Sequence, residues 1–377
     1  MAEERNSGEV ILVTGGSGFL GQHIVKLLQE RDPKVREIRI LDLKPYVNHL
    51  GHEENKPMKA IEGDIVHKEG SREAFRGVDC VIHCAALVSY RFPPDHEALD
   101  RINVTGTQNV VSLCVEMGIP RLVFCSTSEV TLTPYLGGIY TLIFNQTECK
   151  ALPPSCDYER QLLLPGYPAS KLRAEKLVLA ANGRPLADGR GRLHTVALRP
   201  TLLYGEQDPR LLPSLIQLSE KMEGTLMRFA GPGGRQQITY VGNAAWAHLL
   251  AKDQLLVTRP GGGVSGLPIF ITDDTPADDL LFFAQRVTAR ANLPPRCRIS
   301  RWYMPALLAY LIAALLEMVV LIAHIPLSVS PRGAVSYLGS IVLYNRLRAS
   351  LHLNYSPIFP PDESCNRANK YYTREEL

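Results

Sequence analysis

Three glycines at intervals of three residues stand near the start of the chain and constrain its fold more than any other feature. They are Gly15, Gly18 and Gly21 in the segment VTGGSGFLG, between an apolar, β-branched run and residues with helical apolar spacing. A strand, a glycine-rich turn and a helix in this order are typical of a dinucleotide-binding unit. The first glycine allows a tight turn, the second lets a pyrophosphate approach the backbone, and the third lets helix and strand pack closely. We include Phe19 and Leu20, which open the helix, among the expected cofactor-binding residues.

An acidic residue at the end of the next strand makes this signal specific. Asp42 closes the predicted second strand, EIRILDL, about 20 residues after the last glycine. At that position a carboxylate accepts hydrogen bonds from a ribose hydroxyl and repels a 2′-phosphate. The charge therefore favours NAD over NADP, although Lys44 nearby leaves NADP as an alternative.

Strands and helices alternate along the first half of the chain, which predicts an α/β fold. Apolar runs at 10–14, 37–43, 59–65, 79–87, 121–130 and 194–205 are the expected strands, and helical patterns separate most of them. Such strands form a parallel sheet buried on both faces, so we expect a Rossmann-type doubly wound sheet. The predicted organisation is a polar tail at 1–9, the Rossmann domain at 10–205, a smaller substrate-binding region at 206–302, an apolar membrane-associated helix at 303–326 and a C-terminal region at 327–377.

Charge and cysteine content narrow the class of protein. The 41 basic and 38 acidic residues leave a net charge of +3, too balanced for a nucleic-acid-binding surface. The eight cysteines include no CxxC pair, so we expect neither zinc nor a disulfide framework. Single histidines, among them His83 and His248, have no ligand spacing and predict no metal site. The polar residues 1–9 lack the apolar core of a signal peptide, and we expect the catalytic part to face the cytosol.

One apolar segment does not fit a soluble enzyme. The 18 residues from Ala306 to Ala323 carry Glu317 as their only charge, which is near the lower limit for spanning a ~30 Å hydrocarbon layer. A spanning helix, a helix lying in the interface and a buried core helix all remain open. Contact with membrane lipid is favoured, because so uniformly apolar a stretch is poorly explained as an amphipathic surface helix.

A tyrosine and a lysine four residues apart are the candidate catalytic pair. Tyr167 and Lys171, in YPASK, project from one face at the start of a predicted helix. An ammonium neighbour and a positive nicotinamide ring favour the phenolate, so Tyr167 is expected to take an alcohol proton while Lys171 holds the nicotinamide ribose. The preceding CSTS, Cys125 to Ser128, supplies hydroxyls at the end of a strand.

Taken in order, these motifs and the segments GDI, HCAAL, INVTGTQNV, STSEV and LRPTLLYG resemble those of extended short-chain dehydrogenases over most of the chain. Within that superfamily the chain is similar to the 3β-hydroxysteroid dehydrogenase/isomerase group. The resemblance implies that the catalytic hydroxyl is Thr127, with Ser128 as the alternative. It further implies roles near the cofactor for these residues: Asp64, Ile65, Ala85, Ala86, Asn103 and Ser126.

The function expected from this resemblance is NAD-dependent oxidation of a secondary alcohol, the 3β-hydroxyl of a steroid or sterol, at the endoplasmic reticulum membrane. A linked isomerisation and a homodimer are further expectations, but no residue matches an isomerase acid clearly. The segment after STSEV is longer and more apolar than is usual in the family, which affects substrate orientation. Two alternatives remain open: a nucleotide-sugar epimerase or dehydratase, and a non-catalytic NAD-binding membrane protein.

Overall fold

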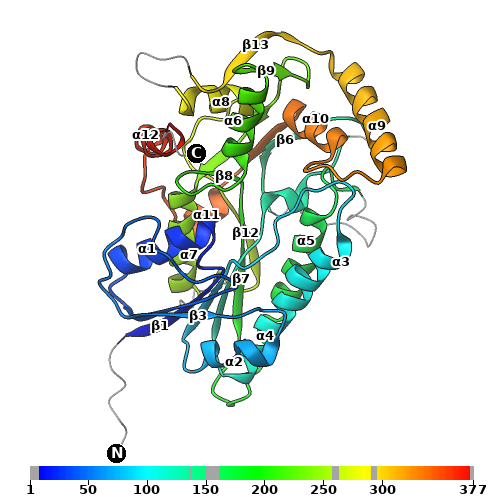
Figure 1. The fold of residues 1–377 in the computed structure, drawn as a ribbon. Helices are drawn as coiled ribbons and strands as arrows, with labels where there is room; N and C mark the ends of the chain where they lie inside the picture. The colour runs from blue at the N-terminus through cyan, green and yellow to red at the C-terminus, as the bar shows by residue number, and fades with distance from the viewer. Residues whose placement is uncertain (1–7, 136–137, 149–160, 257–262, 290–294, 374–377) are drawn as a thin grey trace, which may run out of the picture.

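The protein is described by a computed structural model, which covers residues 8–135, 138–148, 161–256, 263–289 and 295–373 (Figure 1). A seven-stranded sheet in which every neighbouring pair is parallel forms its centre. The strand order is β12-β7-β5-β4-β1-β2-β3. The bounds are β1 Glu9–Thr14, β2 Val35–Asp42, β3 Met58–Glu62, β4 Cys80–His83, β5 Arg121–Cys125, β7 His194–Pro200 and β12 Leu267–Ile271. The Rossmann-type α/β fold is therefore confirmed.

Helices cover both faces of the sheet, as apolar strands without alternation require (Figure 1). One face carries α1 Phe19–Arg31 and α7 Val241–Gln254, which pack against each other. The other face carries α2 Lys68–Phe75, α4 Gly106–Glu116 and α5 Tyr167–Ala180. The short helix α3 His96–Leu99 and a π-helical turn at Asp100–Thr105 lead into α4.

The strand order reverses between β1 and β4, where the chain leaves the sheet toward opposite faces. After β1 it enters α1, and after β4 it passes through a loop toward α4. In parallel sheets this switch point opens a crevice at the carboxyl ends of the strands, and ligands bind there. The glycine turn, Ala85, Ser126 and Tyr167 all belong to segments that meet at this edge.

The second half of the chain builds a smaller region above the sheet and also contributes to the sheet itself. Strand β12 and helix α7 come from the stretch 206–302 but lie in the layers of the main sheet. The domain boundaries stay a prediction. Three small sheets pair β6 Leu142–Gln146 with β14 Ile341–Tyr344 and β10 Arg235–Gln236, β8 Leu202–Tyr204 with β11 Ile238–Tyr240, and β9 Thr225–Arg228 with β13 Arg298–Tyr303. The remaining helices are α6 Leu211–Lys221, α8 Leu280–Val287, α9 Ala306–Ala323, α10 Pro331–Gly339, α11 Leu347–Leu353 and α12 Pro361–Tyr372.

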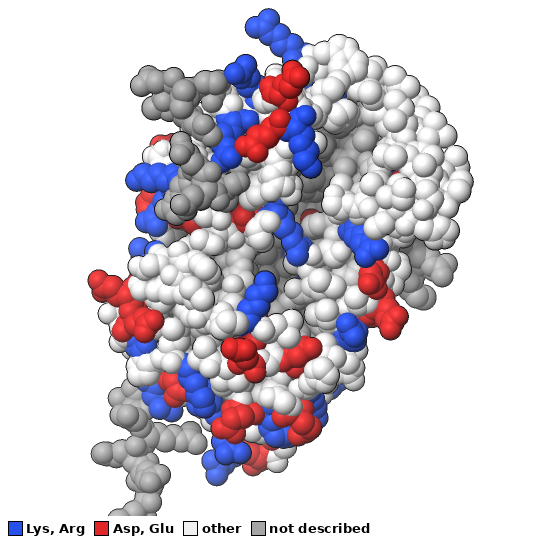
Figure 2. Space-filling view, viewed as in Figure 1, with Lys and Arg blue, Asp and Glu red and all other residues white. Residues whose placement is uncertain are grey.

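Helix α9 is the apolar segment, and it lies on the outside of the molecule (Figure 1). Its mean hydropathy is 2.6, and its buried residues, Ala309, Ala313, Glu317 and Val320, form one stripe. That stripe packs against α10, and most of the remaining side chains of α9 are exposed. The interpretation as a buried core helix is therefore wrong. Glu317, the one charged residue of α9, is buried. Its carboxylate accepts hydrogen bonds from Ser330 Oγ at 2.7 Å and Arg332 Nε at 2.5 Å. Figure 2 shows that the surface at the upper right, over α9, carries no charged side chains.

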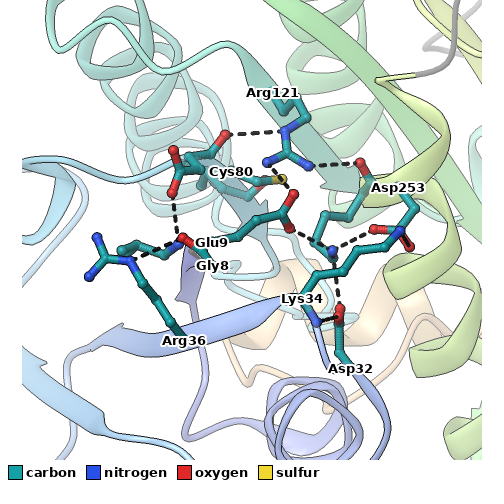
Figure 3. Close-up of polar contacts among 12 residues, drawn as sticks. Gly8, Glu9, Asp32, Lys34, Arg36, Cys80, Arg121 and Asp253 are labelled. Carbon is teal, nitrogen blue, oxygen red and sulfur yellow. Dashed lines mark hydrogen bonds and ion pairs between the residues drawn. The ribbon is translucent and has the colours of Figure 1, made fainter. Parts of the chain in front are cut away.

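A network of buried charges ties the amino end of β1 to α7. Glu9, Asp32 and Asp253 converge there, with Arg121 on the far side of Glu9 (Figure 3). Lys252 is fully buried between the three carboxylates, and its Nζ lies 2.8 Å from Glu9 Oε2, 3.1 Å from Asp32 Oδ2 and 2.5 Å from Asp253 Oδ1. Burial alone would lower the pKa of Lys252, but the hydrogen bonds that its ammonium donates to the carboxylates hold it above the usual value.

We predict that Lys252→Met lowers the free energy of unfolding by about 3–5 kcal/mol, because it leaves the buried carboxylate of Asp32 without its cation and removes one of the two cations that Glu9 and Asp253 each bind. Urea unfolding at neutral pH measures the loss. The matched control is Lys34→Met, since Lys34 binds the same Asp253 from the surface with more than half of its side chain exposed. A surface pair contributes about 0–1 kcal/mol. Equal losses for the two variants would contradict the role assigned to Lys252.

Candidate active site

The glycine turn lies against the end of β4, and each glycine meets a different spatial demand. Gly15 has a φ of +74°, and a Cβ there would lie 2.6 Å from the backbone nitrogen of Ala85. A Cβ on Gly21 would overlap the carbonyl oxygen of Gly15. Gly18 is exposed, and Gly15 O at 3.2 Å is the only atom within 4 Å that its Cβ would meet. The turn thus leaves space in front of the amino end of α1, where N–H groups can bind a phosphate.

Asp42 lies at the entrance of this turn. Its carboxylate accepts the backbone N–H of Ser17 at 3.0 Å and that of Lys44 at 3.2 Å. Each oxygen keeps a lone pair, so the group still has capacity for a sugar hydroxyl. The Ser17 contact holds the carboxylate beside the phosphate-binding turn, which is the geometry that a nucleotide ribose requires.

Two further predicted cofactor residues follow β3. Asp64 accepts the N–H of Val66 at 2.9 Å, and its side chain is about one-third exposed. Ile65 is buried against α4, where a Cβ on Gly106 would lie 2.6 Å from it. Asp64 is therefore accessible at the strand edge, while Ile65 contributes packing. Phe19 and Leu20 open α1, and Leu20 is buried beneath the turn.

Asn103 lies in the π-helical turn and connects the loop after β4 to the catalytic helix. Its Oδ1 accepts the N–H of Leu87 at 2.7 Å, and its Nδ2 donates to Leu87 O and to Ser170 Oγ, both at 2.9 Å. Ser170 lies on α5 between the two candidate catalytic residues. π-Helical turns are often found at functional sites. Asn103 thus positions α5 relative to the loop of Ala85 and Ala86.

Ser126, Thr127 and Ser128 follow β5, and Ser128 is buried. The hydroxyls of the first two are in different environments. Ser126 Oγ is buried and donates to Glu175 Oε2 at 2.5 Å, and Glu175 in turn binds Arg199. Thr127 is only partly buried, and its Oγ1 accepts the N–H of Glu129 at 3.2 Å. A hydroxyl that accepts one bond still has its hydrogen to donate. Of these two, Thr127 is the residue that can donate to a substrate oxygen.

Tyr167 and Lys171 occupy the first turns of α5. The helix begins at Tyr167 because Gly166, with a φ of +84°, turns the chain and Pro168 fits the first helical turn. The ring of Tyr167 packs edge-on against that of Tyr90, with 5.5 Å between centroids. Lys171 is buried, and its Nζ lies 4.1 Å from the centroid of Phe124, a cation–π contact.

Burial dominates the electrostatics of Tyr167. It raises the pKa of the phenol well above its usual value, and negative charges on Glu129 and Cys125 add to this, whereas Arg210 acts in the opposite direction. Burial lowers the pKa of Lys171. Without cofactor, desolvation outweighs nearby positive charge and favours the neutral phenol. The sequence-based expectation of a phenolate also involved the positive nicotinamide ring, so it stays a prediction for the cofactor-bound protein.

Glu129 is a site residue that the sequence analysis did not single out. It is buried and receives the hydroxyl of Tyr90, which lies 2.9 Å from both carboxylate oxygens. Burial raises its pKa to about 7. Its charge also raises the pKa values of Tyr167 and Tyr337, so the carboxyl lies close to the catalytic phenol. Its position two residues after Thr127 was the available signal.

A cavity of about 520 Å³ lies between α9, α10 and the chain that leads into α5. Its size is within the range of small-molecule sites. The Glu317–Arg332 pair is part of its lining. The lining also includes Phe92, Ile139, Leu162, Leu163, Pro165 and Tyr310. Because Pro165 stands two residues before Tyr167, the cavity reaches from the apolar helix toward the catalytic helix.

This fold and site define a Rossmann-type protein with a dinucleotide turn and a tyrosine–lysine pair at the same sheet edge. The chain belongs to the 3-beta hydroxysteroid dehydrogenase/isomerase family, whose family model matches residues 12–300.

Solved structures share the fold over nearly the whole chain. The chain is similar to MoeE5 in complex with UDP-glucuronic acid and NAD, with 20% identity, 97% and 99% of the two chains covered and a TM-score of 0.64. UDP-glucose 4-epimerase from Thermus thermophilus in complex with NAD is 22% identical in sequence, with 97% and 99% of the two chains covered and a TM-score of 0.64. The structure of gox2253 is 21% identical in sequence, with 97% and 98% of the two chains covered and a TM-score of 0.68.

We predict that Glu129 makes folding stability fall as pH rises between about 4.5 and 7. The carboxyl holds its proton more tightly in the folded than in the unfolded chain, so its stabilising contribution is present below the unfolded pKa and is lost as pH rises through about 7. Urea unfolding of the wild type and of Glu129→Gln across this range measures the effect. The variant should lose this part of the pH dependence. Parallel profiles would show that Glu129 titrates normally.

Proposed function

We propose that the protein is an NAD-dependent oxidoreductase that oxidises the 3β-hydroxyl of a steroid or sterol to a ketone at a membrane surface. The observation that carries the proposal is the placement of Tyr167, Lys171 and Thr127 at the sheet edge that also holds the glycine turn. Membership of the family supports the oxidation of a steroid alcohol.

The residues at the sheet edge fit NAD. The space in front of α1 suits the pyrophosphate, and Asp42 beside it suits an unmodified ribose and repels a 2′-phosphate. The titles of two structurally similar proteins, MoeE5 and the Thermus thermophilus epimerase, record NAD. When bound, NAD accepts a hydride from the carbinol carbon, and its positive ring favours nearby negative charge.

The chain's own residues supply positioning and proton transfer. Thr127 donates its free hydroxyl hydrogen to the substrate oxygen and orients the alcohol. Tyr167 takes the hydroxyl proton as the carbonyl forms. Because burial keeps this phenol protonated, the proton-accepting form depends on positive charge brought to the cleft. Lys171, fixed over Phe124, is placed to hold the nicotinamide ribose rather than to ionise Tyr167 by direct contact.

Glu129 gives a linked isomerisation a candidate acid–base group. A carboxyl with a pKa of about 7 both gives and takes a proton near neutral pH, which moving a double bond next to a new ketone requires. The hydrogen bond that it accepts from Tyr90 and its effect on the pKa of Tyr167 support a role close to the reacting oxygen.

Helix α9 supports a lipid substrate and a membrane location. Its outward residues are highly exposed, for example Leu311 at 53%, Leu315 at 58% and Ile322 at 79%. The stripe against α10 and the Glu317–Arg332 pair fix the helix to the protein, which favours lying in one leaflet over crossing the bilayer. The cavity under Tyr310 would then take a sterol from the acyl layer. The endoplasmic reticulum and the cytosolic orientation stay predictions.

A nucleotide-sugar epimerase is the second candidate, because the structurally similar proteins include a UDP-glucose 4-epimerase. Such an enzyme binds a second diphosphate with basic residues. Arg199 is buried and bound to Glu175, and a bond to phosphate would disrupt that pair. Arg235 is exposed on β10 and remains available to bind a diphosphate.

We predict that Tyr167→Phe lowers kcat by about 10²–10⁴-fold on a 3β-hydroxysterol with little change in NAD affinity, because only the proton acceptor is lost. NADH absorbance follows turnover, and mass spectrometry of the product identifies the ketone. Tyr204→Phe is the control, since Tyr204 is buried and bonded to Thr275 beneath the site.

Retained turnover in Tyr167→Phe would reject the mechanism. Turnover of UDP-sugars but of no sterol would favour the epimerase. Tight NAD binding without turnover of any alcohol would identify a non-catalytic protein.

We predict that changing Leu311, Leu315 and Ile322 together to Gln greatly reduces cosedimentation with phosphatidylcholine vesicles, because their burial in lipid supplies roughly 25 cal/mol per Å² of apolar surface. Leu218→Gln is the control, since Leu218 is 42% exposed on α6. Equal vesicle binding by the triple variant and the control would show that α9 does not contact lipid.

A further inference from the structure

Two cysteines and a histidine from three separate elements meet beneath the cofactor-binding edge. Cys84 directly follows β4, Cys125 ends β5, and His248 lies on α7, which packs against both strands. The two strands pair with His83 opposite Phe124, so the cysteines that follow are next to each other across the sheet. Their two sulfur atoms and a ring nitrogen of His248 all lie within 4.8 Å of one another.

The tautomer of His248 is fixed by its backbone contact. Nδ1 lies 2.8 Å from the carbonyl oxygen of Ala244, and a carbonyl only accepts, so Nδ1 carries the hydrogen. The other nitrogen, Nε2, then presents a lone pair. His248 is fully buried, and the thiol of Cys125 is the donor that faces this nitrogen in the described part of the chain. Because a thiol is only a weak hydrogen-bond donor, it satisfies this buried acceptor poorly.

This arrangement is the one found around bound metal ions. A histidine ligand usually donates its second ring N–H to a carbonyl or carboxylate, which orients the ring toward the metal. In a tetrahedral zinc site with Zn–S bonds of about 2.3 Å, the sulfur atoms lie about 3.8 Å apart. From at most 4.8 Å, the two sulfur atoms would close by up to about 1 Å, and each sulfur and the nitrogen by up to about 1.3 Å.

We propose that Cys84, Cys125 and His248 bind a thiophilic metal ion, Zn²⁺, between the carboxyl ends of β4 and β5 and helix α7. Two thiolates and one imidazole satisfy the preference of Zn²⁺ for sulfur and nitrogen ligands and leave a fourth position. Both cysteines are partly exposed, which provides an entry path to the buried histidine.

The bound ion would connect the segments that position the reaction. Cys84 immediately precedes Ala85, and Cys125 immediately precedes Ser126 and Thr127. A metal held by both cysteines and by α7 fixes the spacing of these strand ends and stabilises the folded state by preferential binding. The proposal does not depend on the substrate or on the proposed reaction, so either can fail alone.

The test measures metal rather than activity. The full-length protein is loaded with Zn²⁺ under reducing conditions, dialysed against metal-free buffer and assayed by mass spectrometry of the metal. We expect about one retained ion per chain and a higher Tm. With Co²⁺ in place of Zn²⁺, thiolate-to-metal charge-transfer absorption in the near ultraviolet should appear.

Three variants and one matched control assign the site. Cys84→Ser, Cys125→Ser and His248→Gln should each weaken Zn²⁺ binding by at least about 100-fold, since the loss of second-shell groups alone costs 10–100-fold. Cys80→Ala should bind as the wild type does, because Cys80 lies on the same strand but outside the cluster. If a variant fails to fold, X-ray absorption of the wild type decides: two sulfur neighbours at about 2.3 Å and one nitrogen at about 2.0 Å are expected.

Three results would overturn the proposal. They are a wild type that retains no more metal than Cys84→Ser, an absorption spectrum without sulfur neighbours, and a protein that binds no metal but carries a Cys84–Cys125 disulfide.

Discussion

The close approach of the ends of β1 and β4 underlies the proposed active site of this chain. Gly15 can lie against Ala85 only because it has no Cβ and can adopt a positive φ. That approach brings the amino end of α1, the loop after β4 and the hydroxyls after β5 to one edge of the sheet. Asn103 extends the arrangement to α5 by bonding both Leu87 and Ser170. A wider spacing at Gly15 would displace the cofactor cradle relative to Tyr167 and Thr127 together.

In the proposed mechanism, the charges at this edge make the role of Tyr167 as a base depend on the bound cofactor. Tyr167 is buried beside Glu129, and both effects favour the neutral phenol. Lys171 lies against Phe124, and its own burial lowers its pKa. In the proposed mechanism, bound NAD⁺ would supply the positive charge that favours loss of the tyrosine proton. The basicity available at Tyr167 would then depend on the presence of the hydride acceptor.

The parts of the structure that follow from local pattern were predictable, and those that depend on distant contacts were not. The apolar strands, the glycine turn and the YxxxK helix are each encoded within a few residues, and the structure has each where it was expected. The joining of β12 to the main sheet depends on its pairing with β7, some 70 residues earlier. In the sequence Glu129 resembles an ordinary acidic residue, because the contact that distinguishes it comes from Tyr90, 39 residues away. Cys84, Cys125 and His248 come from three separate elements. Their separations in the sequence therefore match no metal-ligand motif that could have predicted the group.

An ultraviolet difference titration of tyrosine ionisation tests the central claim most directly. The spectrum of the wild type minus that of Tyr167→Phe isolates this phenol and can be recorded with no cofactor, with NAD⁺ and with NADH. The account predicts no tyrosinate from Tyr167 at neutral pH without cofactor or with NADH, and its appearance with NAD⁺. Ionisation at neutral pH in the cofactor-free protein, or a titration that NAD⁺ does not change, would contradict it.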